Sequence, residues 1–263
     1  MTDRDSYCSP RFSFEGVCEQ LQGIVDLGAT HFELDAEQIT ARACEELRSI
    51  RDSGRTGPVR WCIPEERPIR TKATNSYQPG SKGGLSAQAQ LSFVWEIEKS
   101  DKRDEFSIVG LCSTKVTLVD KSEKLGGLTK PLAWTFEMGN GDSPGCHFHT
   151  QIDWKTPAEV MFLEADMHGW PSLDIPRLPS FLITPGDCLD YVLGELFQDG
   201  KDGWPQRYED TDPAKIGRWL SASRRRVVAI LKTSIQAAES GGRMSPWIAI
   251  KKWYPKDPKF LLS

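Results

Sequence analysis

Between residues 91 and 154 lie several runs in which every second residue is apolar, and these runs restrict the fold more than any other feature of the chain. Two of the alternating runs are Leu91, Phe93, Trp95 and Ile97, followed later by Leu132, Trp134, Phe136 and Met138. A longer apolar run covers residues 106–119, with Gly110 as a predicted bulge, and alternation returns over residues 146–154. Consecutive strands joined by short connections favour an antiparallel meander.

Helical spacing of apolar residues marks both ends of the chain. Residues 12–53 contain two such stripes, and the second begins with a capping-box-like pattern at Asp35. In the segment 184–241, Thr184-Pro185 and Asp212-Pro213 each combine an N-cap residue with proline at the first helical position. These patterns predict helices before and after the sheet.

We therefore predict one α+β domain over residues 1–263, an antiparallel β-meander of about five or six strands with two N-terminal and two C-terminal helices packed on it. Its expected parts are a helical part at 12–53, an irregular connection at 54–84, the sheet at 85–167, a helical part at 184–241 and a C-terminal strand at 246–255. Prolines and glycines predict the irregular connection, and residues 160–167 would add a fifth strand.

Composition narrows the classes of function. Lys and Arg total 33 against 37 Asp and Glu, a net charge of −4, which argues against binding nucleic acid through bulk positive charge. No stretch approaches the roughly 18 to 20 apolar residues of a membrane span. The seven cysteines are scattered without a C-x-x-C pair, as expected for buried thiols in a reducing compartment. We therefore expect a cytoplasmic protein that does not associate with membranes.

A histidine-containing strand carries the clearest candidate chemistry. It reads Cys146-His147-Phe148-His149-Thr150-Gln151-Ile152-Asp153-Trp154 and holds two of the four histidines of the chain. Alternation places His147, His149, Gln151 and Asp153 on one face of the strand. This polar row is either a site or the solvated face of an amphipathic strand, and the sequence leaves both interpretations open.

Three chemistries suit the two imidazoles. Together they could ligate one divalent metal ion, with Asp153, Glu137 or the distant His168 completing the shell. They could instead act as acid and base on a phosphate ester, with Gln151 donating to a phosphoryl oxygen. One imidazole could also be a covalent nucleophile in nucleotidyl transfer. The sequence requires no cofactor, and a divalent metal remains one of the alternatives.

The register of the preceding hairpin decides which groups face this row. A pairing of Met138 with Cys146 would place Glu137 opposite His147, where its carboxylate could orient the imidazole. The same register would place Thr135 opposite the second histidine. Glu137 thereby joins the two histidines and the glutamine as a candidate catalytic residue.

The segment Gly141-Asp142-Ser143-Pro144-Gly145-Cys146-His147-Phe148-His149-Thr150-Gln151-Ile152 resembles the His-x-His-x-Gln signature of the galactose-1-phosphate uridylyltransferase branch of the histidine-triad superfamily. The resemblance implies that His149 is the nucleophile at an α-phosphate and that Gln151 contacts the phosphoryl oxygens. It departs from that family in context, because more than a hundred residues follow the motif.

A second resemblance concerns the order of elements. Strands, the His-x-His hairpin, Pro176-Arg177-Leu178-Pro179 and a following helix resemble the arrangement in uncharacterised bacterial proteins found among mobile-element and phage-defence genes. It implies a bacterial context and no particular activity.

Three arginines are candidate ligands for phosphate. Arg177 lies between two prolines on a stiff extended segment. Arg224 and Arg225 begin a run of three arginines in the last helical segment, to which Arg218 and Lys232 add positive charge. Salt bridges and solvated helix faces are the alternative roles of these side chains.

Two hypotheses of different class follow. In the first, the chain is a bacterial partner-binding or sensor component of a larger system such as phage defence, and binds a protein partner or a second copy of itself. In the alternative, it is a hydrolase or transferase acting on nucleotide or RNA phosphoesters through His147 and His149, with or without a metal ion. Whether the protein is an enzyme stays open at this point.

Overall fold

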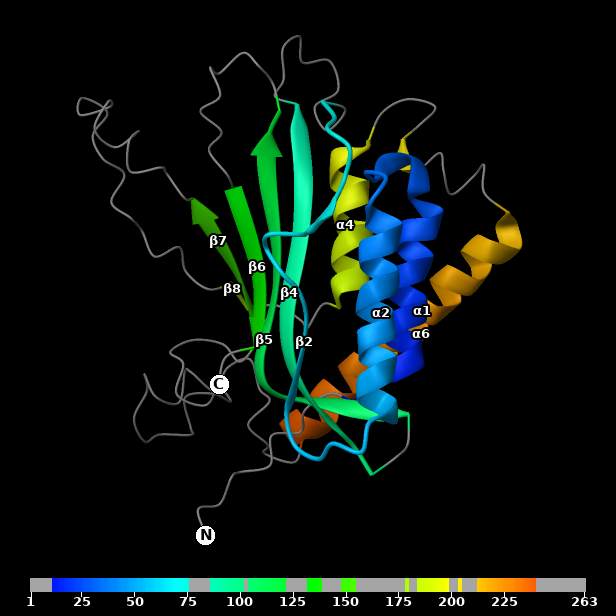
Figure 1. The fold of residues 1–263 in the computed structure, drawn as a ribbon, viewed down its shortest axis with the longest axis vertical. Coiled ribbons are helices and arrows are strands. Elements are labelled where there is room, and N and C mark those ends of the chain that lie inside the picture. Colours follow the sequence, from blue (N-terminus) through cyan, green and yellow to red (C-terminus); the bar gives the residue numbers. More distant parts are fainter. Residues whose placement is uncertain are drawn as a thin grey trace, which may run out of the picture.

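The fold was examined in a computed structural model that describes residues 11–75, 86–101, 104–121, 132–138, 148–154, 178–179, 184–198, 203–204 and 212–239. Within these residues an antiparallel sheet lies beside a group of helices (Figure 1). This arrangement confirms the predicted α+β class. The strands predicted at 160–167 and 246–255 lie outside the described residues.

The strands form one sheet in the order β2-β4-β5-β6-β7-β8, with β1 paired to β5 and β3 to β4. Their bounds are β1 Arg11–Ser13, β2 Val59–Ile63, β3 Ile69–Arg70, β4 Ala87–Lys99, β5 Glu105–Asp120, β6 Leu132–Met138, β7 Phe148–Trp154 and β8 Leu178–Pro179. Strands β4 to β7 follow one another in the chain and pair antiparallel with their neighbours, which confirms the predicted meander.

The expectation of an irregular connection over residues 54–84 is wrong for two segments. Strand β2 pairs with β4 over its whole length, and β3 pairs with the next part of β4. Trp61 and Ile63 are buried, whereas Arg60 is exposed and Cys62 is only partly buried, so β2 has the alternation of a half-buried strand. The alternating run is only five residues long, and the prolines and glycines around it favour loops, so the sequence did not predict a strand here.

Strand β5 contains the predicted bulge. The pairing with β4 passes from Trp95↔Cys112 to Ile97↔Ile108, so residues 109–111 of β5 face only Glu96. The Oε2 atom of Glu96 accepts a hydrogen bond from the backbone N–H of Leu111 at 3.1 Å. A Cβ atom on Gly110 would lie 2.0 Å from that same oxygen, so any larger residue at position 110 would displace the Glu96 carboxylate from this hydrogen bond.

The helices are α1 (Phe14–Leu27), α2 (Ala36–Asp52), α4 (Pro185–Leu196) and α6 (Pro213–Glu239), with the 3-10 turn η1 (Ala29–His31) after α1. Helices α1, α2 and α4 run beside one another next to the sheet, and α6 crosses them at an angle and packs against α1 (Figure 1). No helix among the described residues combines the length and the apolar character needed to cross a membrane.

Capping residues set the starts of the helices. The Thr184 hydroxyl oxygen accepts from the N–H of Asp187 at 3.2 Å, and an Asp212 oxygen accepts from the N–H of Ala214 at 2.9 Å, as predicted. The capping box predicted at Asp35 is wrong. Within the described residues its side chain caps no N–H of α2 and forms an ion pair with Arg70 of β3 instead.

Aromatic side chains fill the space between the sheet and the helices. The rings of Trp61 and Trp95 meet edge to face, with centroids 5.8 Å apart. Both indole N–H groups have acceptors: that of Trp61 donates to the carbonyl of Ala43 at 2.9 Å and that of Trp95 to the hydroxyl of Thr114 at 3.1 Å. These buried tryptophans therefore leave no donor unsatisfied.

Gly28, directly after helix α1, lies in close contact with α4. A Cβ atom on Gly28 would lie 2.8 Å from a methyl carbon of Leu193 and 2.9 Å from the ring of Phe32, and both of these side chains are buried. Only a residue without a side chain allows this packing.

We expect Gly28→Ala to lower the free energy of unfolding by about 1 to 3 kcal/mol, because the added methyl group overpacks the contact between α1 and α4. Urea unfolding would measure the change. The matched control is Gly217→Ala in α6, where nothing lies within 4 Å of the added Cβ. This control should be neutral or stabilising by up to about 1 kcal/mol. Equal stabilities for the two variants would contradict the packing at Gly28.

Candidate functional site

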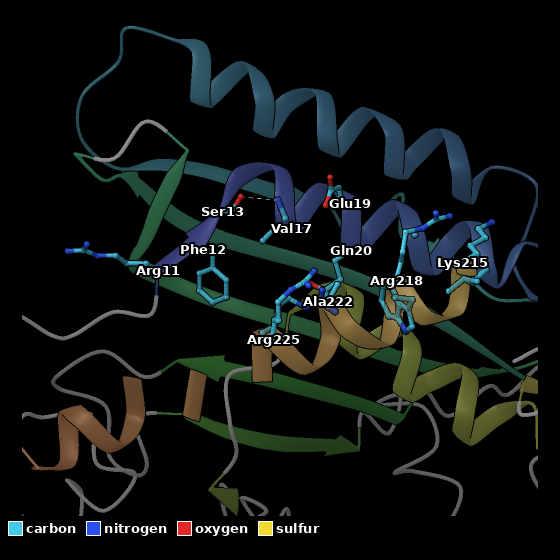
Figure 2. Close-up of a pocket in the computed structure, with 15 residues that line it drawn as sticks. Arg11, Phe12, Ser13, Val17, Glu19, Gln20, Lys215, Arg218, Ala222 and Arg225 are labelled. Atoms are coloured by element: carbon cyan, nitrogen blue, oxygen red, sulfur yellow. Dashed lines mark hydrogen bonds between the residues drawn. The ribbon is translucent and has the colours of Figure 1, made fainter. Parts of the chain in front are cut away.

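A groove of about 640 Å³ lies between α1, β1 and α6 (Figure 2). Helix α6 contributes Lys215, Arg218, Trp219, Ala222, Arg225 and Arg226 to its lining. These positions recur every three or four residues and therefore share one face of the helix. The volume lies within the range of roughly 300 to 1,000 Å³ that is typical of small-molecule sites.

The opposite wall comes from α1 and from β1 before it. Gly16, Gln20 and Gly23 recur on one face of α1 and line the groove. A Cβ atom on Gly23 would lie 3.6 Å from the ring of Trp219, so this glycine brings the two helices close together. Phe12 and Val17 add apolar surface to this wall.

Most of the charged residues in the lining are basic. It contains Arg11, Lys215, Arg218, Arg225 and Arg226 but only one acidic residue, Glu19. Lys215, Arg218 and Arg225 form no ion pair with any described residue. In Figure 2 the basic side chains follow α6 from Lys215 and Arg218 to Arg225. Within the described part of the chain, the groove therefore combines excess positive charge with an apolar wall.

Arg226 is the basic residue most affected by burial. Its side chain is 16 % exposed, and its Nη2 atom lies 3.3 Å from an Asp187 oxygen. Its Cζ atom lies 5.3 Å from the centroid of the Trp219 ring, a cation–π contact. Burial lowers the pKa of this guanidinium, although Asp187 acts in the opposite direction. The Asp187 carboxylate thus offsets the effect of burial on the pKa of Arg226 only in part.

Asp187 joins three helices beneath the groove. One of its oxygens accepts from the amide of Gln20 on α1 and from Arg226 on α6. The hydroxyl of Thr184, at the start of α4, lies 2.8 Å from the other Asp187 oxygen and 2.8 Å from the Gln20 carbonyl oxygen. A Cβ atom on Gly186 would lie 2.8 Å from the Gln20 side chain, so Gly186 makes room for this contact.

Two buried donors at the groove have no acceptor within the described part of the chain. The Trp219 side chain is only 6 % exposed, and its Nε1 atom makes no hydrogen bond there. The Nε atom of Arg226 is likewise buried and unpaired. Buried donors are normally satisfied, and both of these residues line the groove.

The predicted phosphate ligands have different positions in the structure. Arg225 lines the groove, whereas Arg224 is exposed and does not contribute to the lining. Arg177 lies outside the described residues. The sequence analysis missed Arg226 and Trp219 as a pair, although basic residues at 215, 218 and 225 on the same helical face as Trp219 could have indicated them.

The hairpin register differs from the predicted one. Met138 pairs with Phe148 instead of Cys146, so Glu137 lies opposite His149. The shift is two residues, which keeps the same face of the strand but changes every partner. His147 lies outside the described residues. The sheet therefore brings Glu137 and His149 together at one register position.

The other residues of the polar row lie at neighbouring positions. Gln151 pairs with Thr135 and Asp153 with Ala133. The predicted metal set of His147, His149 and Asp153 stays a prediction, since it includes a residue outside the described part. Among the described residues, no group of three or more His, Cys, Asp or Glu side chains is arranged to hold a metal ion.

No known protein family, curated protein or solved structure matches the chain. The resemblances to the histidine-triad superfamily and to phage-defence proteins therefore stay predictions. Function has to be inferred from the groove and the hairpin themselves.

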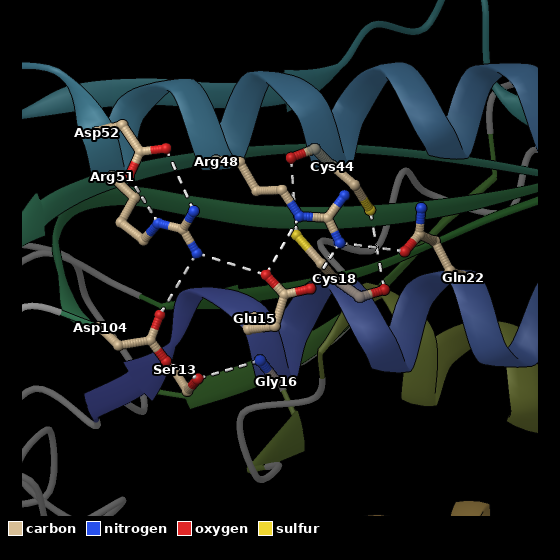
Figure 3. A network of polar contacts seen from close by, with 10 residues as sticks. All are labelled: Ser13, Glu15, Gly16, Cys18, Gln22, Cys44, Arg48, Arg51, Asp52 and Asp104. Carbon is tan, nitrogen blue, oxygen red and sulfur yellow. Dashed lines mark hydrogen bonds and ion pairs between the residues drawn. The ribbon is translucent and has the colours of Figure 1, made fainter.

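A second polar cluster, between α1 and α2, has a structural role (Figure 3). Arg48 on α2 holds both oxygens of Glu15 on α1, at 2.6 and 3.2 Å, and Arg51 reaches the same carboxylate at 3.4 Å. Beside it, the buried thiols of Cys18 and Cys44 each point to the backbone carbonyl of the other residue, at 3.7 and 3.8 Å. All of these groups have partners within the two helices, which leaves no vacant site there.

We expect Glu15→Gln to destabilise the protein at neutral pH by at most about 1 kcal/mol, because solvent screens this partly exposed carboxylate. The hydrogen bond from Arg48 lowers the pKa of Glu15 below its ordinary value of 4.5. Its stabilising contribution is therefore complete above pH 4.5 and is lost as the pH falls through the lowered pKa.

Thermal unfolding of wild type and Glu15→Gln from pH 7 to pH 3 would measure this effect. The difference in Tm should shrink with acidification. Glu45→Gln, at an exposed position of α2, is the control and should follow wild type throughout. A constant difference for Glu15→Gln across this range would contradict the assigned role of the ion pair.

Proposed function

We propose that the protein is a binding or sensor component that takes an anionic ligand into the groove between α1 and α6. The observation that carries the proposal is a set of three basic residues that form no ion pair with any described residue, beside the apolar wall of the same cavity: Lys215, Arg218 and Arg225. Such a lining lowers the free energy of a ligand that combines negative charge with apolar surface.

The groove favours binding over catalysis. Ser13 is its only lining hydroxyl among the described residues, and it is already engaged. Its oxygen accepts from the N–H of Gly16 at 3.1 Å and donates to Asp104 at 2.6 Å. Glu19 is the only acidic lining residue, and no imidazole or thiol of the described residues accompanies it. The carboxylate that accepts from Ser13 is not part of the described lining, and no histidine or cysteine of the described lining could serve as a nucleophile.

The Asp187 network supports a sensor role. A ligand in the groove competes with Asp187 for the donors of Arg226, and Asp187 also contacts α1 and α4. Occupancy of the groove therefore alters a contact shared by three helices. A partner protein that recognises this part of the surface would detect the ligand through that change.

We expect some small anions to raise the Tm of the wild-type protein, as any ligand of the folded state does. A thermal-shift panel of sulfate, citrate, tri-glutamate and pyrophosphate at 150 mM salt would test this. The double variant Arg218→Ala, Arg225→Ala should lose most of the shift, because it removes two unpaired cations from the lining.

Arg224→Ala is the matched control, since Arg224 lies on the same helix but outside the groove. It should retain the wild-type shift. The proposal would be wrong if no anion stabilised the protein, or if the control lost as much of the shift as the double variant.

A second candidate function rests on the hairpin. The register that sets Glu137 opposite His149 favours a phosphoester hydrolase or transferase, because cross-strand neighbours are close enough for a carboxylate to orient an imidazole. Gln151, two positions along the same face, would then contact a phosphoryl oxygen. This candidate involves different elements from the groove and is tested separately.

If the hairpin is catalytic, His149→Ala should reduce turnover of nucleotide or RNA phosphoesters by about 100-fold or more, and Glu137→Gln by less, with Tm unchanged. Thr135→Val is the control, since Thr135 lies opposite Gln151 and has no assigned chemistry. Turnover that survives His149→Ala, or no turnover of any nucleotide substrate by the wild type, excludes this function.

A further inference from the structure

The geometry points to a phosphorylated small molecule of nucleotide size as the ligand of the groove, with its phosphate held by Arg218, Arg225 and Arg226. This inference rests on the proposed function and narrows it to one chemical class. It follows from the kind of cation in the groove, from the unsatisfied donors and from the shape of the apolar wall.

The kind of cation favours phosphate over a single carboxylate. A guanidinium presents a planar fork of N–H donors that matches two oxygens of a phosphate group. Arg218 and Arg225 lie two turns apart on the groove face of α6, with the small residue Ala222 between them. Seven residues of helix span about 10 Å, so these forks flank one cavity from two points. Several cations are best balanced by a ligand with more than one negative charge.

The unsatisfied donors favour a ligand with several oxygens. Arg226 offers five N–H donors, of which the structure pairs one with Asp187. Its Nε atom and the Nε1 atom of Trp219 are buried without acceptors in the described part of the chain. A phosphate oxygen that reached these donors would satisfy them.

The volume and the apolar wall favour more than a bare phosphate. About 640 Å³ exceeds what one phosphate fills and suits a ligand of a few tens of atoms. Phe12, Val17 and Leu27 supply apolar lining from β1 and α1. A phosphate linked to a flat ring whose faces can pack on apolar side chains satisfies both halves of the groove, and a nucleotide is the common molecule of this type.

Isothermal titration calorimetry on the full chain at low salt tests the inference directly. The probes are ATP, GTP, CTP, UTP, pyrophosphate, adenosine and tri-glutamate. We expect at least one nucleoside triphosphate to bind at one site at least tenfold more tightly than pyrophosphate, while adenosine and tri-glutamate bind no tighter than pyrophosphate. The double variant Arg218→Ala, Arg225→Ala should weaken that binding at least tenfold, and Arg224→Ala by less than twofold.

Arg226→Lys provides an independent variant. It keeps a positive charge beside Asp187 and so preserves the network beneath the groove, but it removes the planar fork. Its Tm should stay near that of wild type while nucleotide binding weakens at least tenfold. A variant that binds nucleotide as wild type does would overturn the role assigned to Arg226 at the phosphate.

The remaining outcomes separate this inference from the proposed function. Binding of tri-glutamate with the same dependence on Arg218 and Arg225, without binding of any phosphate probe, would overturn the phosphorylated ligand and leave an anion-binding groove. Pyrophosphate binding as tight as that of the nucleotides would overturn the nucleotide size. No binding of any probe, or binding that the double variant leaves unchanged, would overturn both.

Discussion

The Asp187 carboxylate is the contact on which the helical layer depends. It receives donors from Gln20, 167 residues earlier in the chain, and from Arg226, 39 residues later, while its own backbone N–H closes the cap at Thr184. The Asp187 side chain is only 21 % exposed. A carboxylate largely removed from water is costly unless several donors surround it. Packing of α1, α4 and α6 is therefore specified by polar geometry as well as by apolar contact.

The same arrangement explains why a groove exists between α1 and α6. Gln20 must reach Asp187 past Gly186, and Gly23 must accommodate the ring of Trp219, so small residues line this face of α1. Along α6 the groove is positively charged, and no described carboxylate forms an ion pair with Lys215 or Arg218. The same two helices, α1 and α6, thus account for both the shape and the charge of the groove.

The sequence predicted the helix caps and the bulge better than it predicted which elements lie next to one another. Helix caps at Thr184 and Asp212 and the bulge at Gly110 depend on residues close in the chain, and all three are confirmed. The hairpin register was off by two residues because a long connection does not fix pairing. The groove joins α1 to α6 across about 200 residues, and no local pattern encodes which faces of two distant helices meet.

The short strands after α2 have a consequence for the outer side of β4. That strand is 13 residues long and strongly apolar, and a long exposed edge of this kind recruits strands from other molecules. Here β2 covers residues 93–97, β3 covers 90–91, and Thr74 bridges to Ala87. Between them these small elements occupy most of the edge in succession, and Arg60 adds a charge to β2. The segment predicted as a loop thus blocks the pairing of β4 with strands of other molecules. Removing this segment would expose the edge of β4 and favour aggregation.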